Sequence, residues 1–217
     1  MARCGGGAGH TDGWQGDAAA RAARANLKPD FFFLVCEAAC PIGGASFLVD
    51  GLRIFQQLPP DVQSELRRGS ARTGGGRRGH IDATAQGRLI QFNADADDTD
   101  GEELRAQREA VAAARAAAAA APELGAETRR LLDRSNAAQL ELEVEKAGLM
   151  LARAEGAAER AVALFTWAVF VAQAHAPRFR LAPGQALLCD NYRVHHGRDA
   201  YRVRSSSESF AAAVLLS

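Results

Sequence analysis

The chain has 217 residues, enough to bury the core of one domain of ordinary size. Lys plus Arg and Asp plus Glu both number 26, so the formal net charge is zero. This balance does not favour nucleic acid or an anionic membrane surface as the main partner. No apolar run approaches the length of a membrane span, and the N-terminus has no apolar signal-peptide core. We therefore expect an intracellular, cytoplasmic protein, with an organelle left open.

The four cysteines form no repeated pair, and the spacing of Cys36 and Cys40 is not that of a redox CxxC motif. We expect all four to be reduced thiols in a reducing compartment.

Close to the N-terminus, the chain carries the tripeptide His10-Thr11-Asp12. Residues at i and i+2 project from the same face of an extended segment, so His10 and Asp12 could reach one metal ion together. The alternative is a surface turn with Asp12 and Gly13 at its tip.

The segment 31–36 is aromatic and β-branched, which predicts a buried central strand. Gly43 and Gly44 then predict a turn, which read by itself would be a simple hairpin. Apolar spacing predicts a helix over 51–58, which Pro59 would end, and another short helix over 61–68.

From 102 to 174 the chain reads as helical and rich in alanine. Within it, four residues recur at the spacing of one helical face: Leu140, Val144, Ala147 and Leu151. Glu141 and Glu145 lie beside that stripe, on its polar flank. We interpret the region as a packing or lid insertion, and a surface for a partner helix is the alternative. The segment 161–174 is apolar nearly all round, which predicts a helix buried against a sheet.

The most informative stretch is 178–201, near the C-terminus. Alternating residues predict a short strand over 178–181 and a mostly buried strand over 186–189. Asp190 and Asn191 predict a tight turn, after which the chain presents His195 and His196. A histidine at a strand end suits a metal ligand on a rigid scaffold, although a single histidine is more often structural or solvated.

Several positions in this stretch together resemble the distal-histidine segment of the TauD/TfdA family: Pro183-Gly184, Asp190-Asn191, Arg193 and His196-Gly197-Arg198. This family of Fe(II)- and 2-oxoglutarate-dependent dioxygenases is related to γ-butyrobetaine hydroxylase and clavaminate synthase. The resemblance covers about 10–58 and 160–204. It implies an α+β fold with a mainly β core, a double-stranded β-helix (jelly-roll), carrying the long Ala-rich helical insertion 102–174. It also implies one domain over 1–217 that is short at its N-terminus.

By this resemblance His196, and not His195, is an iron ligand, because it directly precedes Gly-Arg. The family's upstream His-x-Asp pair falls on His10 and Asp12, and Ser46 falls where a hydroxyl helps to bind 2-oxoglutarate. Two histidines and one carboxylate leave coordination positions open, as in Fe(II) oxygenases, rather than closing the site as in structural zinc. The implied reaction is hydroxylation of a small molecule by O2 and 2-oxoglutarate, with release of succinate and CO2.

One part of the family pattern is missing. The arginine that pairs with the far carboxylate of 2-oxoglutarate is expected eleven to fifteen residues after the distal histidine, where this chain has none. Arg202 and Arg204 are the nearest candidates, and the alternative is that both simply lie on a solvent-exposed strand. The substrate's identity and the oligomeric state are not predicted by the sequence.

Two other functions stay open. One is a degenerate or truncated family member that binds a metal or ligand without turnover, which the short N-terminus and the missing arginine favour. The other is a helical interaction protein built on 102–160. Iron-dependent formation of succinate would separate the enzyme from both.

Overall fold

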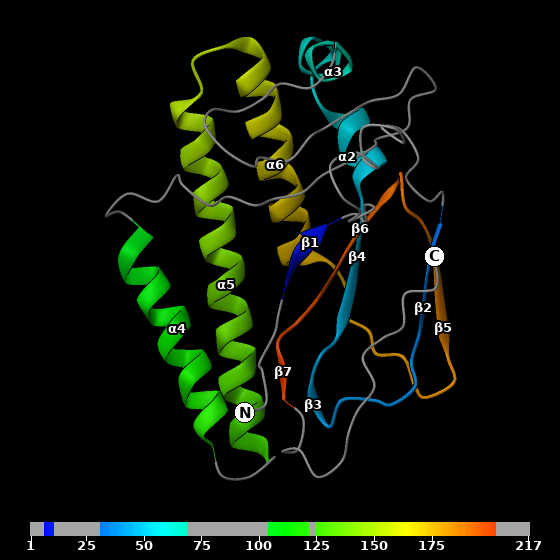
Figure 1. Ribbon diagram of the computed structural model, residues 1–217. Helices are drawn as coiled ribbons and strands as arrows, with labels where there is room; N and C mark the ends of the chain where they lie inside the picture. The colour runs from blue at the N-terminus through cyan, green and yellow to red at the C-terminus, as the bar shows by residue number, and fades with distance from the viewer. Residues whose placement is uncertain (1–6, 11–30, 69–103, 122–124, 203–217) are drawn as a thin grey trace, which may run out of the picture.

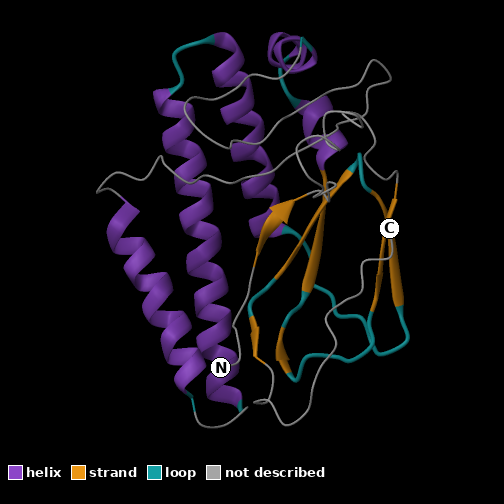
Figure 2. Ribbon diagram, viewed as in Figure 1, coloured by secondary structure: helices purple, strands orange, loops and turns teal. Residues whose placement is uncertain are grey.

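The computed structural model describes residues 7–10, 31–68, 104–121 and 125–202. Helices and strands are segregated in it, with the long helices on one side and the strands on the other (Figures 1 and 2). Within the described residues the strands form three small antiparallel sheets. The molecule is therefore of the α+β class.

The central sheet has three strands in the order β1-β6-β4, formed by Gly7–His10, Val194–Arg198 and Ser46–Asp50. The middle strand, β6, pairs antiparallel with both neighbours. Burial alternates along β4 and β6 because successive side chains of a strand point to opposite faces. One face of this sheet is consequently core, and the other is half-buried.

The second sheet pairs β2 (Phe31–Val35) with β5 (Ala186–Asp190). The strand predicted over 31–36 is confirmed as β2, but it is not buried as predicted. Phe32 is buried, but Phe31, Phe33 and Val35 are 56%, 41% and 39% exposed. Successive side chains of a strand point to opposite faces, so Phe32 is covered by packing against the ring of His196, whereas Phe31, Phe33 and Val35 lie on the outer face. A strand over 186–189 is confirmed as part of β5, but the prediction that it is mostly buried is wrong, since Leu188 is 64% exposed and of these four residues Cys189 alone is buried.

The glycine turn moves the chain from one sheet to another. Gly43 and Gly44 both have φ of 71°, a conformation that side chains other than glycine rarely adopt. Before the turn, β3 (Ile42–Gly43) pairs with β7 (Tyr201–Arg202), and after it β4 pairs with β6. The simple hairpin is therefore wrong, because β3 and β4 have different partners.

The short strand predicted over 178–181 is also wrong. Phe179 makes a single bridge to Ser46, in which their backbone N–H groups donate to each other's carbonyls at 2.8 and 3.0 Å. Pro177, which has no N–H to donate, precedes this bridge, and the turn at Gly184, with φ of 83°, follows it. The segment therefore makes one isolated bridge instead of a strand.

The two short helices predicted from the first half of the chain are confirmed as α2 (Gly51–Gln57) and α3 (Pro60–Arg67). Asp50 caps α2, since its Oδ1 accepts from the backbone N–H of Arg53 at 2.9 Å. α3 begins with Pro60, which suits a first helical position because no intrahelical N–H is needed there.

The helical character predicted over 102–174 is confirmed as three helices: α4 (Arg105–Ala120), α5 (Ala126–Arg153) and α6 (Ala157–His175). α5 packs on both of the others, so it buries residues on two sides. Leu142 packs with Val111 of α4, whereas Ala147 belongs to the cluster around α6. That these helices form an insertion remains a prediction.

α6 lies against the central sheet, as predicted for a helix preceding the C-terminal strands. Phe165, Val169 and Phe170 are at most 1% exposed and pack with Phe55 of α2. Trp167 is the exception, since it is 38% exposed. None of the described helices combines the length and the apolar character needed to cross a membrane.

Candidate functional site

Strand β6 carries the two consecutive histidines, and it directs them to opposite faces of the central sheet. The ring of His195 lies edge-on to Phe165 of α6, with centroids 6.1 Å apart. The ring of His196 lies against Phe32 of β2, with centroids 4.1 Å apart and planes tilted by 38°. His195 therefore faces the helices, and His196 faces the second sheet.

His195 belongs to the core. It is 2% exposed, and its Nε2 approaches Gly51 so closely that a Cβ there would lie only 2.2 Å away. Gly197, two residues further along β6, lies on the same face and meets the buried ring of Phe47. A Cβ at position 197 would lie 2.3 Å from Cζ of Phe47. Both glycines are thus required by close packing on the helix-facing side.

His196 is half-buried, and it is paired on both sides. In the backbone register Leu48 of β4 is opposite it on one side, and His10 of β1 is opposite it on the other. Directly opposed residues of an antiparallel pair are nearest neighbours across the strands, with Cα atoms about 4.5–5.5 Å apart. The structure thus brings sequence positions 10 and 196 together, although 186 residues separate them in the chain (196 − 10).

Asp12, the third predicted ligand, lies outside the described residues, as does Arg204. Arg202 ends β7, where its backbone pairs with Ile42. Among the described residues no group of three histidine, cysteine, aspartate or glutamate side chains could hold a metal ion. This finding does not bear on the predicted set of His10, Asp12 and His196, because Asp12 lies outside the described residues.

Ser46 lies on the same strand face as Leu48, two residues away, and its register partner on β6 is Arg198. Its backbone is fixed by the bridge to Phe179. Ser46 and His196 are therefore one step apart on the half-buried face of neighbouring strands.

Arg198 is a residue that we did not single out for a role from the sequence. It follows His196 by two positions, which places it on the same face of β6. Its Nε donates to the carbonyl of Gly44 at 3.1 Å, and its Nη2 lies 3.0 Å from Sγ of Cys40. The guanidinium also lies over the ring of Tyr201, with Cζ 4.6 Å from the centroid. The i+2 spacing from His196 was the signal that could have identified it.

Two neighbouring arginines differ from Arg198 because each has a carboxylate partner. Arg193 donates to Oδ2 of Asp50 through Nε at 3.0 Å and Nη2 at 2.6 Å. Nε of Arg178 lies 3.3 Å from Oδ1 of Asp199. Among the described residues no carboxylate lies within ion-pair distance of Arg198. Of these three arginines, Arg198 is therefore the one whose guanidinium is not neutralised by a described carboxylate. Its donors remain suited to a carboxylate of a ligand.

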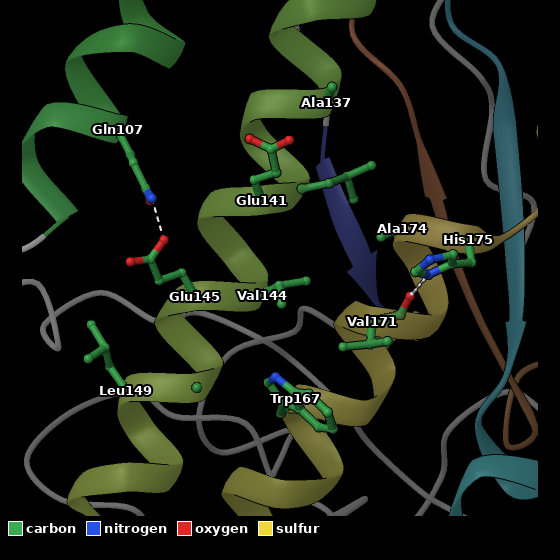
Figure 3. A pocket seen from close by; sticks show the side chains of 12 residues that line it. Gln107, Ala137, Glu141, Val144, Glu145, Leu149, Trp167, Val171, Ala174 and His175 are labelled. Carbon is green, nitrogen blue, oxygen red and sulfur yellow. Dashed lines mark hydrogen bonds between the residues drawn. The ribbon is translucent and has the colours of Figure 1, made fainter.

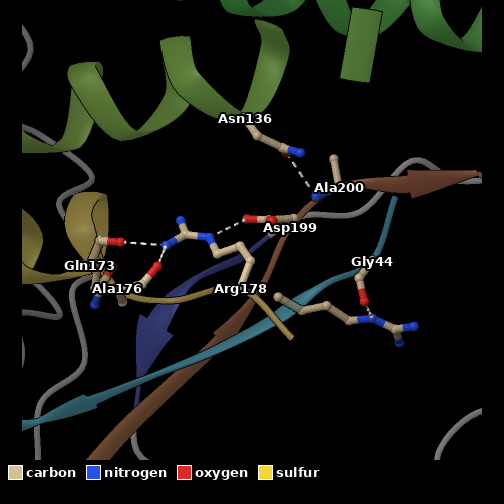
Figure 4. A network of polar contacts seen from close by, with 8 residues as sticks. Gly44, Asn136, Gln173, Ala176, Arg178, Asp199 and Ala200 are labelled. Carbon is tan, nitrogen blue, oxygen red and sulfur yellow. Dashed lines mark hydrogen bonds and ion pairs between the residues drawn. The ribbon is translucent and has the colours of Figure 1, made fainter. Parts of the chain in front are cut away.

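Arg178 joins the end of α6 to the end of β6 (Figure 4). Its Nη1 donates to the carbonyls of Gln173 and Ala176, both at 2.7 Å, and its guanidinium lies 4.4 Å from the ring centroid of Phe47. Burial raises the pKa of the partner carboxyl, Asp199, although the positive charge of Arg178 opposes that rise. This network holds the helical layer against the central sheet.

The pKa of Asp50 shifts in the opposite direction. Burial would raise it, but hydrogen bonds from Arg193 and from the backbone N–H of Arg53 outweigh burial, so the pKa is lowered. Asp50 thus remains ionised and joins the start of α2 to the turn before β6.

The cysteines do not add a second candidate centre. Cys36, Cys40 and Cys189 are free thiols, as predicted. Burial raises the pKa of the Cys189 thiol to about 11, so it is protonated at neutral pH and is a poor ligand or nucleophile.

A scan against protein-family models matches residues 9–209 to the family described as taurine catabolism dioxygenase TauD, TfdA family. A search of curated proteins found no match. The relation to γ-butyrobetaine hydroxylase and clavaminate synthase stays a prediction. Because the matched range covers most of the chain, including His10, β4 and the histidines of β6, the chain belongs to the TauD/TfdA family.

Proposed function

We propose that this chain is an Fe(II)- and 2-oxoglutarate-dependent dioxygenase that hydroxylates a small molecule, releasing succinate and CO2. The observation that carries the proposal is the register of β1 and β6, in which His10 is opposite His196. Family membership supports it, since enzymes of this type are typical of the family. We also propose that the three described sheets are parts of a jelly-roll core.

In the proposed site His10, Asp12 and His196 hold the iron. Imidazole nitrogens and one carboxylate oxygen are a donor set that binds Fe(II) and leaves positions open. When bound, the metal would supply activation of O2, with 2-oxoglutarate as the co-oxidised partner. The half-burial of His196 between two sheets, against Phe32, limits its contact with water while the face beside Ser46 stays open.

For the far carboxylate of 2-oxoglutarate we propose Arg198 as a third candidate beside Arg202 and Arg204. It lies on the face of His196, its register partner is Ser46, and no described carboxylate neutralises it. Replacement by glutamine should weaken binding of 2-oxoglutarate to the Fe(II)-loaded protein. Arg180→Gln is the matched control, because that exposed arginine lies outside β6.

The test of the iron site is an anaerobic titration with Fe(II) followed by 2-oxoglutarate. A chelated complex gives a visible charge-transfer band, so binding is read without turnover. We expect the band in the parent protein and its loss in His10→Ala and His196→Ala. His195→Ala is the control and should keep the band where it folds. No iron binding by the parent protein would contradict the site.

A degenerate family member that binds metal without turnover is the second candidate. The missing downstream arginine favours it, because no arginine follows in the expected window. In that case iron would bind without the band, or the band would form without succinate. Succinate released in proportion to 2-oxoglutarate consumed would exclude it.

A further inference from the structure

The helical layer carries a concave site of its own, apart from the strand that bears His196. It has a volume of about 830 Å³ and lies where α5 and α6 meet, with Gln107 of α4 at its rim (Figure 3). This size falls within the range of small-molecule pockets. His196 faces the opposite side of the central sheet, so the two sites are separate.

The wall of this site is apolar. Val144 of α5 lies opposite Val171 and Trp167 of α6 in Figure 3, and Leu140 of α5 also lines the hollow. Trp167 is 38% exposed although Phe165 and Phe170 of the same helix are buried, so one aromatic surface remains open to a ligand. An exposed indole face at the edge of an apolar hollow attracts cations through its quadrupole.

Two carboxylates line the site, and His175 lines it as well, with its Nδ1 2.8 Å from the carbonyl oxygen of Val171. Glu141 and Glu145 are four residues apart on α5, so they share one side of the helix and repel each other. Neither forms an ion pair with any described residue. Glu145 accepts a hydrogen bond from the side-chain amide of Gln107, which fixes that carboxylate at the rim. The amide oxygen of Gln107 is buried and has no hydrogen-bond partner among the described residues.

From these features we propose that the α5–α6 site binds an organic cation, an amine or quaternary ammonium attached to an apolar or aromatic body. The positive group would lie between Trp167 and the carboxylates of Glu141 and Glu145, and the body would cover Leu140 and Val144. An anion would meet two like charges, and a neutral ligand would gain from the apolar wall alone. The proposal does not depend on the iron site.

The first experiment uses the single tryptophan of the site as its own reporter. The chain has two tryptophans, so Trp14→Phe leaves Trp167 as the only one. The metal-free protein is titrated with benzyltrimethylammonium, and with benzyl alcohol and 3-phenylpropionate as neutral and anionic comparisons. We expect a saturable change in Trp167 emission with the cation, binding about five-fold weaker with the alcohol, and none with the anion. Added salt should weaken binding of the cation.

The second experiment removes the charges without changing the shape. The double variant Glu141→Gln, Glu145→Gln should bind benzyltrimethylammonium about five-fold more weakly. Glu127→Gln, on the first turn of the same helix and outside the site, is the matched control and should bind like the parent. Calorimetry on Trp167→Leu should give a similar weakening. Equal affinity for the three probes, no saturable change, or parental affinity in the double variant would overturn the proposal.

Discussion

The two faces of the β4–β6 pair are built from adjacent residues and yet differ in what surrounds them. The face toward the helices is fully buried and comprises Phe47, Val49, His195 and Gly197. The face toward β2 is half-buried or exposed and comprises Ser46, Leu48, His196 and Arg198. One residue along the strand is enough to exchange a packed core for an accessible surface.

We expect this difference to separate the two histidines by function. On the helix-facing side, space is so restricted that Gly51 and Gly197 have no room for a Cβ without displacement of a neighbour. On the other side, polar groups and a guanidinium stand beside His196. Substitutions on the first face should therefore change stability, whereas substitutions on the second should change binding.

The largest expected effect distinguishes the two histidines by metal affinity. His196→Ala should weaken Fe(II) binding at least about 100-fold, because removal of a ligand exceeds the 10–100-fold loss typical of its supporting partners. His195→Ala should change affinity only a few-fold. Anaerobic calorimetry with Fe(II) measures both. Equal losses in the two variants would mean that the faces are not functionally separate.

The reverse order is expected for stability. His195→Ala should lower the free energy of unfolding by about 2–4 kcal/mol, as for other large-to-small changes in a core. Its ring fills the space between Phe165 and Gly51, and nothing else described replaces it there. His196→Ala should cost less, since that side chain is only half-buried. Urea unfolding followed by circular dichroism gives both values, and a larger loss in His196→Ala would reverse the comparison.

A glycine pair sharpens the same comparison. Gly197→Ala should destabilise by about 1–3 kcal/mol, because the added methyl meets the buried ring of Phe47. Gly148→Ala, in the interior of α5, should instead stabilise by about 0.5–1 kcal/mol, since its nearest side-chain atom lies 3.9 Å away on Trp167. Thermal melts of the two variants should shift in opposite directions. An unchanged melting temperature in Gly197→Ala would show that the side chains on the helix-facing side can move to accommodate a methyl group.

The sequence was most informative where structure depends on neighbouring residues. The helices over 102–174 and the two short helices were predictable because their apolar periodicity is local. The choice of His196 over His195 came from a resemblance, and the opposed faces of β6 are consistent with it. Of the predicted site, positions 10, 46 and 196 are brought to neighbouring strands.

What could not be predicted depends on contacts between distant segments. Which face of β2 is covered depends on His196, which packs against Phe32 and lies more than 150 positions away in the chain. The sheet change at Gly43 depends on β7 in the same way. At the site beside Trp167, the residue of α5 that faces the ring is Gly148, which has no side chain to cover it, and periodicity within α6 cannot reveal this. Local pattern gives the elements, and long-range pairing decides which of their faces are open.

The smallest effect concerns Asp50, which lies at the end of the half-buried face. Its lowered pKa means that the folded state favours the carboxylate, so its stabilising effect is present above the unfolded pKa of about 3.9 and is lost as pH falls through the lower folded value. Asp50→Asn keeps a good helix cap but removes the charge beside Arg193. Because both partners are partly exposed, we expect a loss of about one or two degrees in Tm at pH 7.

This difference between the parent and Asp50→Asn should shrink steadily as the pH is lowered from 5 toward 3. Arg193→Met removes the other partner and should produce a similar loss at pH 7 without adding to that of Asp50→Asn, because the two changes break one interaction. Melts of the four proteins over this pH range measure the coupling. Additive losses, or a difference that does not depend on pH, would mean that Asp50 acts through the cap of α2 alone. The ion pair of Asp50 and Arg193 would then contribute nothing measurable to the stability of the protein.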